Sequence, residues 1–125
     1  MLTYTKVTFL LALLNLGNAA PLTAPASGCP SVTIITARAS TEAAGEGITG
    51  TVAAAIQSMS TQTVARYSVS YPATLTNYAA SAASGVAALK SQLTTLVNAC
   101  PSSKFVLLGY SQGLQTLNPV SNVTS

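Results

Sequence analysis

One short stretch of the sequence, residues 109–113, has residue types and spacing suited to nucleophilic chemistry. It reads Gly-Tyr-Ser-Gln-Gly and directly follows an apolar run at 105–108. A G-x-S-x-G motif between a buried strand and a helix is typical of a nucleophile elbow, a sharp turn that projects the serine hydroxyl from the top of a sheet. The flanking glycines let the backbone crowd there, and the next residue's N–H faces the developing oxyanion. We therefore predict Ser111 as a candidate nucleophile; an ordinary Gly-containing turn is the alternative.

A serine hydroxyl needs a base to take its proton, usually an imidazole oriented by a carboxylate. The sequence contains no histidine, and its two acidic residues are both glutamates, Glu42 and Glu46. Both glutamates lie in an early loop, while Lys90 and Lys104 belong to a helix face and a strand entry. None of these four residues is well placed to serve as the base. We therefore expect the chain as given to be inactive as a hydrolase.

The segments that must position residues 109–113 alternate between strand and helix patterns. Short β-branched or alternating runs predict strands, and apolar residues spaced three and four apart predict helices. The predicted order is a strand at 31–37, a loop at 38–50, a helix at 48–59, a strand at 65–71, a helix at 77–100 and a strand at 105–108. Strands joined by helical crossovers form a parallel sheet wrapped by helices, so we predict an α/β architecture.

Three of these elements carry more specific expectations. The helix at 77–100 takes Asn77 as its N-cap and buries one apolar stripe. The stripe consists of Tyr78, Ala82, Val86, Leu89, Leu93, Leu96, Val97 and Cys100. The strand at 65–71 alternates apolar and polar residues, as expected at a sheet edge. The strand at 105–108 is continuously apolar, as expected of a central strand buried on both faces.

The first residues are typical of a secretory signal peptide. Lys6 precedes an apolar run at 7–16, and small residues at 17–19 match a cleavage site. The apolar run is about half of the ~20 residues that a membrane-spanning helix needs. We therefore predict a signal peptide at 1–20, an irregular lead-in at 21–30 and an exported mature protein that is not attached to a membrane.

The charges that remain after the signal peptide exclude one class of partner. Four basic and two acidic residues are scattered along the chain. No basic cluster is available to neutralise a row of phosphates, so nucleic acid is excluded as a partner.

The two cysteines, Cys29 and Cys100, form an even pair in a protein predicted to be exported. Such a pair is most simply a disulfide. The alternatives are a metal site and a reactive thiol, but no histidine or further cysteine lies nearby. We predict the disulfide, and we expect neither a metal nor a cofactor.

Four segments together resemble the cutinase and acetylxylan esterase family of secreted serine esterases. Cys-Pro at 29–30 precedes the first strand, and Ala-Arg-Ala-Ser-Thr-Glu at 37–42 follows it. Cys-Pro at 100–101 precedes the third strand, and Gly-Tyr-Ser-Gln-Gly at 109–113 follows that strand. The resemblance implies an α/β-hydrolase fold, a three-layer sandwich with helices on both faces of a parallel sheet. The family's sheet has the order 2-1-3-4-5, of which this chain supplies strands 2, 1 and 3.

The resemblance also implies roles for individual residues. Ser111 matches the family's nucleophile, and Gln112 matches the oxyanion-hole residue that donates its backbone N–H. Ser40 matches the second oxyanion contributor, which uses its backbone N–H and its hydroxyl. Cys29 and Cys100 match the family's N-terminal disulfide.

The loop that carries Ser40 departs from the family at one position. Ala39 stands where many cutinases have glycine, which is expected to alter the loop backbone and to displace Ser40 slightly. The alternative role for Ser40 is that of an ordinary loop hydroxyl with satisfied hydrogen bonds. For Arg38 and Glu42 we expect polar contacts that anchor the loop.

The chain departs further from the family after residue 113. Residues 114–125 do not resemble the family's continuation, and Pro119 is expected to stop the helix that follows the turn. We therefore expect a partial cutinase-like domain at 31–113, truncated after the elbow with its C-terminal strands missing, and a divergent tail at 114–125. The strand at 105–108, which is internal in the family, is then expected to be an edge of the sheet. The tail contains a candidate N-glycosylation site at Asn122.

Two functions from different classes fit these observations. The first is a secreted, extracellular serine esterase that acts through Ser111 on carboxylic esters of plant cell-wall or cuticle polymers, either cutin or acetylated xylan, and is monomeric if complete. The Tyr-Pro-Ala step at 71–73 is closer to the acetylxylan esterase branch, although that branch's extra cysteine pair is absent. The alternative is a non-catalytic secreted fragment or a cell-wall-binding protein.

Overall fold

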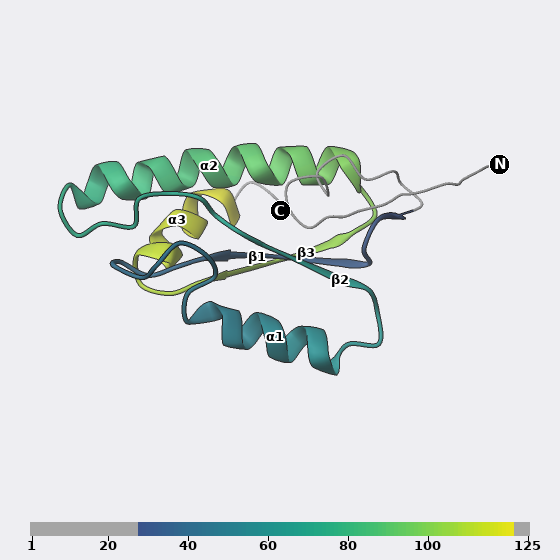
Figure 1. Ribbon diagram of the computed structural model, residues 1–125. Helices are drawn as coiled ribbons and strands as arrows, with labels where there is room; N and C mark the ends of the chain where they lie inside the picture. Colours follow the sequence, from purple (N-terminus) through teal and green to yellow (C-terminus); the bar gives the residue numbers. More distant parts are fainter. Residues whose placement is uncertain (1–27, 122–125) are drawn as a thin grey trace.

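The computed structural model describes residues 28–121. The described chain forms a three-stranded parallel sheet with helices on both faces (Figure 1). The elements in chain order are β1 (Val32–Ala37), α1 (Thr49–Met59), β2 (Val64–Ser68), α2 (Tyr78–Ala99), β3 (Lys104–Gly109) and α3 (Gln112–Ser121). The predicted α/β fold is therefore confirmed. The predicted signal peptide, most of the predicted lead-in and Asn122 lie outside the described residues.

The central strand of the sheet is β1, which lies between β2 and β3 and runs parallel to both. Ile34 pairs with Arg66 of β2 on one side and with Val106 of β3 on the other. Almost all of β1 is buried, because layers of helix cover both of its faces. The order β2-β1-β3 agrees with the expected topology, and β2 lies at an edge as its alternating polar residues predicted.

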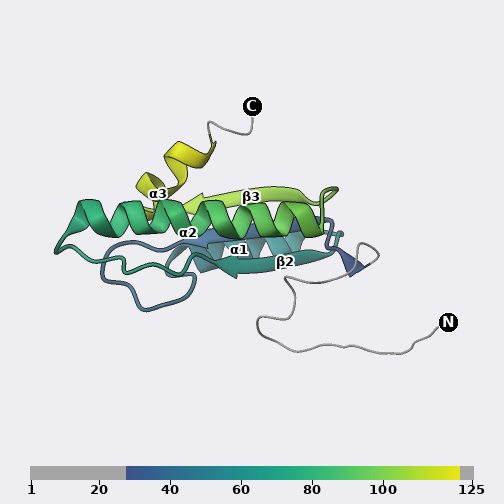
Figure 2. The ribbon, with the colours of Figure 1, turned by 90° about the horizontal axis from the view of Figure 1, so that it is seen from above.

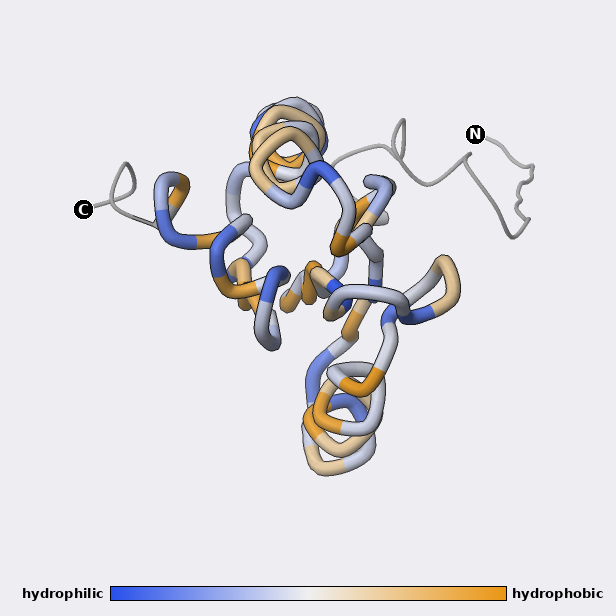
Figure 3. Tube along the Cα trace, turned by 90° about the vertical axis from the view of Figure 1, so that its left-hand side faces the viewer, coloured by the Kyte–Doolittle hydropathy of each residue, from blue (hydrophilic) through white to orange (hydrophobic). Residues whose placement is uncertain are grey.

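The main core lies on the face of the sheet covered by α2 and α3. Viewed end-on, α2 lies on one side of the strands and α1 on the other (Figure 3). The buried apolar cluster contains Ile35, Ala37, Val69, Tyr71, Ala73, Leu89, Leu96, Leu117 and Val120. On α1 the buried residues are Thr49 and Ala53. The side of the sheet beneath α2 therefore provides most of the apolar burial that stabilises the described domain.

The apolar stripe predicted for α2 is correct in the middle of the helix and wrong near its ends. Leu89 and Leu96 are buried, whereas Tyr78 and Val97 are 39% and 38% exposed. The start of α2 extends beyond the ends of the strands (Figure 2). None of the described helices is long and apolar enough to cross a membrane.

Two predictions about helix ends are only partly correct or wrong. Asn77 occupies the N-cap position of α2 as predicted, but it adopts a left-handed conformation with φ of 52° and its side chain makes no capping hydrogen bond. Its carbonyl oxygen instead accepts a hydrogen bond from the Ser81 N–H. Pro119 lies inside α3 rather than ending it. Proline removes one helical hydrogen bond, and the buried side chains of Leu117 and Val120 on either side hold this turn against the core.

The two edge strands differ in how they were predicted. β2 ends at Ser68, earlier than predicted, and Val69 and Tyr71 are buried beyond it where the chain turns into the core. Within residues 28–121, β3 pairs with β1 alone and its residues are only partly buried. The strand whose apolar run is typical of a central position is therefore an edge of the described sheet, as expected when its outer neighbours are missing. On the α1 side, Leu108 lines an open hollow of about 410 Å³.

The predicted disulfide is confirmed: Cys29 is bonded to Cys100, 71 positions later in the chain. Cys29 lies just before β1, and Cys100 follows the last residue of α2. The bond therefore fixes the start of the central strand to the end of the helix that covers it.

Replacing both cysteines by alanine is expected to lower the free energy of unfolding by about 4 kcal/mol, because a loop of this length strongly restricts the unfolded chain. Denaturant unfolding of the oxidised protein and of the Cys29→Ala/Cys100→Ala variant measures the difference. Dithiothreitol should shift the parent's midpoint to that of the variant and leave the variant unchanged. Equal midpoints for the oxidised parent and the variant would contradict the expectation.

Candidate active site

The carboxyl ends of β1 and β3 bring two of the predicted site segments together. In a parallel sheet, neighbouring strands end at the same edge, where open α/β folds bind their ligands. The loop after β1 carries Ser40, and the turn after β3 carries Ser111 and Gln112. Ser40 and Gln112 lie 72 positions apart in the sequence, and a direct hydrogen bond joins their side chains.

The turn that holds Ser111 has the strained geometry predicted for a nucleophile elbow. Ser111 has a φ of +57°, a left-handed conformation that non-glycine residues adopt uncommonly. The Gly113 N–H donates to the Tyr110 carbonyl at 3.0 Å, which closes the turn as α3 begins. Ser111 itself is exposed. Strain of this kind persists where the surrounding structure enforces it, and it is concentrated at functional sites.

The glycine at position 113 is required by close backbone packing between α3 and β1. A Cβ atom added at Gly113 would lie 2.0 Å from the Ala37 carbonyl oxygen and 3.0 Å from that of Arg38. A Cβ added at Gly109 would lie 2.7 Å from the Gly113 carbonyl oxygen. The two glycines of the motif therefore let the elbow contact the end of the central strand directly.

The side chain of Gln112 is fully buried and has every polar atom paired. Its Nε2 donates to Ser40 Oγ at 2.7 Å and to the Thr74 carbonyl at 3.0 Å. Its Oε1 accepts from Ser81 Oγ at 2.5 Å. This single carboxamide joins α3 to the β1 loop, to the loop before α2, and to α2 itself. It therefore fixes Ser40 relative to the elbow.

Two backbone N–H groups on the site segments are unpaired. Within the described residues, neither the Ser40 N–H nor the Gln112 N–H donates a hydrogen bond to the protein. The two segments are joined by the hydrogen bond between the Gln112 and Ser40 side chains. Gln112 is the first residue of α3, and unpaired N–H groups at the start of a helix favour negative charge. The site segments therefore offer donors that could bind an anionic group.

The loop after β1 is anchored by Arg38 and Glu42, as predicted. Arg38 donates to the Glu42 carbonyl at 2.9 Å and to the Tyr71 carbonyl at 2.6 Å, and the Tyr71 hydroxyl donates back to the Arg38 carbonyl. The Glu42 carboxylate accepts from the N–H groups of Ala39 and Ile48, both at 2.7 Å. Burial raises the pKa of Tyr71, so its hydroxyl remains a proton donor at neutral pH.

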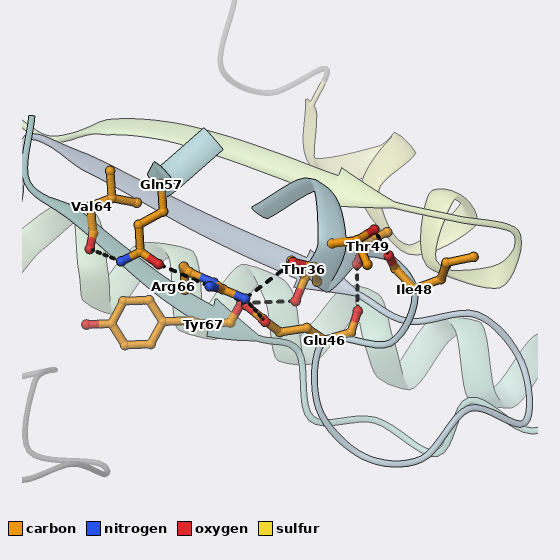
Figure 4. Close-up of polar contacts among 10 residues, drawn as sticks. Thr36, Glu46, Ile48, Thr49, Gln57, Val64, Arg66 and Tyr67 are labelled. Atoms are coloured by element: carbon orange, nitrogen blue, oxygen red, sulfur yellow. Dashed lines mark hydrogen bonds and ion pairs between the residues drawn. The ribbon is translucent and has the colours of Figure 1, made fainter. Parts of the chain in front are cut away.

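A second polar cluster anchors the far end of the same loop (Figure 4). Arg66 of β2 forms an ion pair with Glu46 and donates to Gln57 Oε1 at 3.0 Å. The hydrogen bond to the Glu46 carboxylate raises the pKa of Arg66. Gln57 in turn donates to the Val64 carbonyl at 3.3 Å. The cluster ties the loop and α1 to the edge strand.

Both carboxylates of the chain are therefore engaged in structural contacts. Glu42 holds two backbone N–H groups, and Glu46 holds Arg66. This supports the expectation that neither is the missing base for Ser111. Among the described residues, no three side chains of types that bind metal ions are clustered.

Sequence reasoning did not find two residues that the structure places at the site. Ser81 and Thr74 both contact the Gln112 side chain. The weak signal for Ser81 was its position on the inward face of the long helix, where a serine interrupts an apolar stripe. Thr74 contacts Gln112 through its backbone carbonyl, which every residue type has, so the sequence could not indicate this contact.

Comparisons with known proteins point in one direction. The family model described as Cutinase matches residues 28–124. Acetylxylan esterase 2 from Talaromyces purpureogenus is 36% identical over 115 residues, which cover 84% of this chain and 49% of that protein. Cutinase 4 from Emericella nidulans is 36% identical over 102 residues, which cover 79% of this chain and 46% of that protein.

A solved structure supports the same relationship. The catalytic core domain of acetylxylan esterase from Trichoderma reesei superposes with a TM-score of 0.68 and 29% sequence identity, covering 72% of this chain and 47% of that one. The chain therefore spans about half the length of the relatives that it matches.

Replacing Gly113 by alanine is expected to lower the free energy of unfolding by about 3 kcal/mol, the upper end of the usual cost of overpacking. The added Cβ cannot avoid the Ala37 carbonyl without moving α3 away from β1. Denaturant unfolding measures the loss. Gln115→Ala, on the exposed side of the same helix, is the control and should leave stability nearly unchanged. Equal stability of the two variants would show that the close approach is not required.

Proposed function

This chain belongs to the cutinase family, and on that premise we propose that its site carries out the acyl-transfer step of carboxylic-ester hydrolysis with Ser111 as the nucleophile. The observation that carries the proposal is the direct contact between Gln112 and Ser40, beside a serine held at a φ of +57°. A serine with only a structural role seldom has a positive φ. A sharp turn of this kind is, however, what exposes a nucleophile next to prearranged hydrogen-bond donors.

The proposed step follows from this geometry. The Ser111 Oγ attacks the ester carbonyl, and negative charge develops on the carbonyl oxygen. The N–H groups of Gln112 and Ser40, together with the Ser40 hydroxyl, stabilise that charge. The acyl group is then bonded to Ser111 and the alcohol leaves, after which water releases the acid. Each prearranged donor of this kind accounts for about 10²–10³ in rate in well-studied hydrolases.

The sequence offers the Ser111 proton neither a histidine nor an aspartate as acceptor, and both glutamates are engaged in structural contacts. We therefore propose that the chain as given binds and orients an ester but does not turn it over at a useful rate. A base supplied from outside the chain restores the step.

Esters of plant polymers are the proposed substrate class, with cutin and acetylated xylan as the two candidates. Support comes from the names of the relatives, which include an acetylxylan esterase and a cutinase. The exposed side chains of Tyr110 and Leu114 beside Ser111 provide an apolar margin suited to a polymer surface. Secretion through the segment at 1–20 and a monomeric state are parts of the same proposal.

The rival function, a non-catalytic secreted protein that binds cell-wall polymer, is favoured by one observation: the sequence contains no histidine. The rival function gives no reason for the left-handed turn at Ser111 or for the two unpaired N–H groups. The esterase site therefore explains more of the structure.

Imidazole in solution is expected to act as the missing base, because a small general base can take the Ser111 proton when the protein supplies none. With p-nitrophenyl acetate and imidazole, the full chain should release p-nitrophenolate faster than imidazole alone and faster than Ser111→Ala in the same buffer, and should gain one acetyl group on Ser111 by mass spectrometry. Without imidazole, release should not exceed that of Ser111→Ala.

The controls for this experiment are Ser111→Ala, which should remain unmodified, and Ser70→Ala, which removes an exposed serine outside the site and should behave like the parent. Imidazole-dependent acetylation of Ser111→Ala at the parent's rate would refute the proposed nucleophile. Binding of cutin or xylan without any acetylation of Ser111 would favour the rival function.

A further inference from the structure

We propose that Ser81 of α2 is a positioning residue for this site: its hydroxyl fixes the orientation of the Gln112 carboxamide, and that orientation leaves the Ser40 hydrogen available to the oxyanion. The inference rests on the proposed acyl-transfer function. It concerns a residue that touches neither Ser111 nor Ser40 through any hydrogen bond in the described structure.

The contacts around Ser81 form a closed ring of hydrogen bonds. The Thr74 N–H donates to Ser81 Oγ at 3.1 Å, and Ser81 Oγ donates to Gln112 Oε1 at 2.5 Å. Gln112 Nε2 donates to the Thr74 carbonyl at 3.0 Å, which closes the ring. Because an amide oxygen can only accept, the Ser81 hydroxyl must be the donor in its contact with Gln112 Oε1. Ser81 and Gln112 are 3% and 0% exposed, so water does not compete for these bonds.

One N–H of the Gln112 carboxamide lies outside this ring and donates to Ser40 of the site. The second N–H of Gln112 Nε2 donates to Ser40 Oγ at 2.7 Å. A hydroxyl that accepts from an amide keeps its own hydrogen free to donate elsewhere. If the carboxamide were turned over, Oε1 would face Ser40 and accept that hydrogen. The direction of the Gln112 amide therefore decides whether Ser40 can donate to an oxyanion.

Ser81 and the Thr74 carbonyl select the productive direction together. In the turned orientation, Oε1 would face the Thr74 carbonyl oxygen, where two acceptors repel, and the Ser81 hydrogen would lose Oε1 as its acceptor. Among the described residues, Ser81 is the sole donor to Gln112 Oε1. Without it, that oxygen is a buried acceptor with no partner, and the native orientation loses its advantage.

Close packing between helices brings Ser81 within reach of Gln112. One turn after Ser81, a Cβ added at Gly85 would lie 2.7 Å from Thr116 Oγ1 and 2.8 Å from Tyr71 Cδ2. Two small residues on the same face of α2 thus allow it to approach α3. A larger residue at either position would separate the helix from the carboxamide that it orients.

The test is a double-mutant cycle on imidazole-assisted acetylation of Ser111 in the full chain, using the parent, Ser81→Ala, Ser40→Ala and the double variant. Ser40→Ala should lower the rate by roughly 10²-fold, as expected for a lost oxyanion donor. Ser81→Ala should lower it roughly ten-fold in the parent and less than about two-fold in the Ser40→Ala background, because residues that act through one group are not additive.

Controls separate positioning from general damage to the helix. Ser84→Ala, one turn away on the exposed side of α2, should match the parent. Ser81→Thr, which keeps the hydroxyl, should recover most of the rate. An equal loss from Ser81→Ala in both backgrounds, or no loss in the parent, would overturn the proposal. If Ser81→Ala does not fold, Ser81→Cys replaces it, since a thiol is a weak donor of similar size; a parental rate would also overturn the proposal.

A second measurement is independent of catalysis. Hydrogen exchange of the Gln112 side-chain amide, followed by NMR with ¹⁵N-glutamine labelling, should be slow in the parent, Ser84→Ala and Ser81→Thr, and at least about ten-fold faster in Ser81→Ala, because the opened ring no longer holds the amide. Unchanged exchange in Ser81→Ala would refute the role of Ser81. If the parent is never acetylated, the proposed function fails, and this exchange result alone decides whether Ser81 orients the amide.

Discussion

The contact between the Gly113 backbone and the Ala37 carbonyl is the constraint on which the rest of the site depends. A Cβ at position 113 would lie 2.0 Å from that oxygen, so α3 can begin against β1 only if the residue is glycine. This closeness sets the left-handed turn at Ser111 and directs the Gln112 side chain inward between the sheet and α2. The placement of Ser111 relative to the loop that carries Ser40 thus depends on backbone packing.

Buried polar side chains hold the loops around the site in place. Arg38 and Gln112 are both buried, and each is satisfied by groups from segments far away in the sequence. An unpaired buried polar group is costly, so these side chains favour the single arrangement that pairs all of them. The loop after β1 and the loop before α2 therefore have defined positions although neither contains regular structure. Rigid loops of this kind suit a site that must hold donors in place before charge develops.

The sequence predicted the parts of this arrangement that depend on local pattern. The strand at β1, the edge position of β2 and the Gly-Tyr-Ser-Gln-Gly turn all follow from residue type and spacing. It did not predict the role of Ser81, whose partner lies 31 positions away, because periodicity carries no information on polar pairs between distant segments. The absence of a side-chain cap at Asn77 and the continuation of α3 through Pro119 have the same origin. Local preference set those expectations, and tertiary packing overrode it.

The position of the disulfide divides the site between two parts of the chain. The bond from Cys29 to Cys100 encloses β1, α1, β2 and α2, and with them Ser40, while β3, α3 and Ser111 follow it. Proteins open locally in cooperative units, with free energies below that of global unfolding. An opening of β3 and α3 would separate Ser111 from Ser40 while the covalent ring stays closed. The disulfide therefore holds only one of the two segments that form the candidate site.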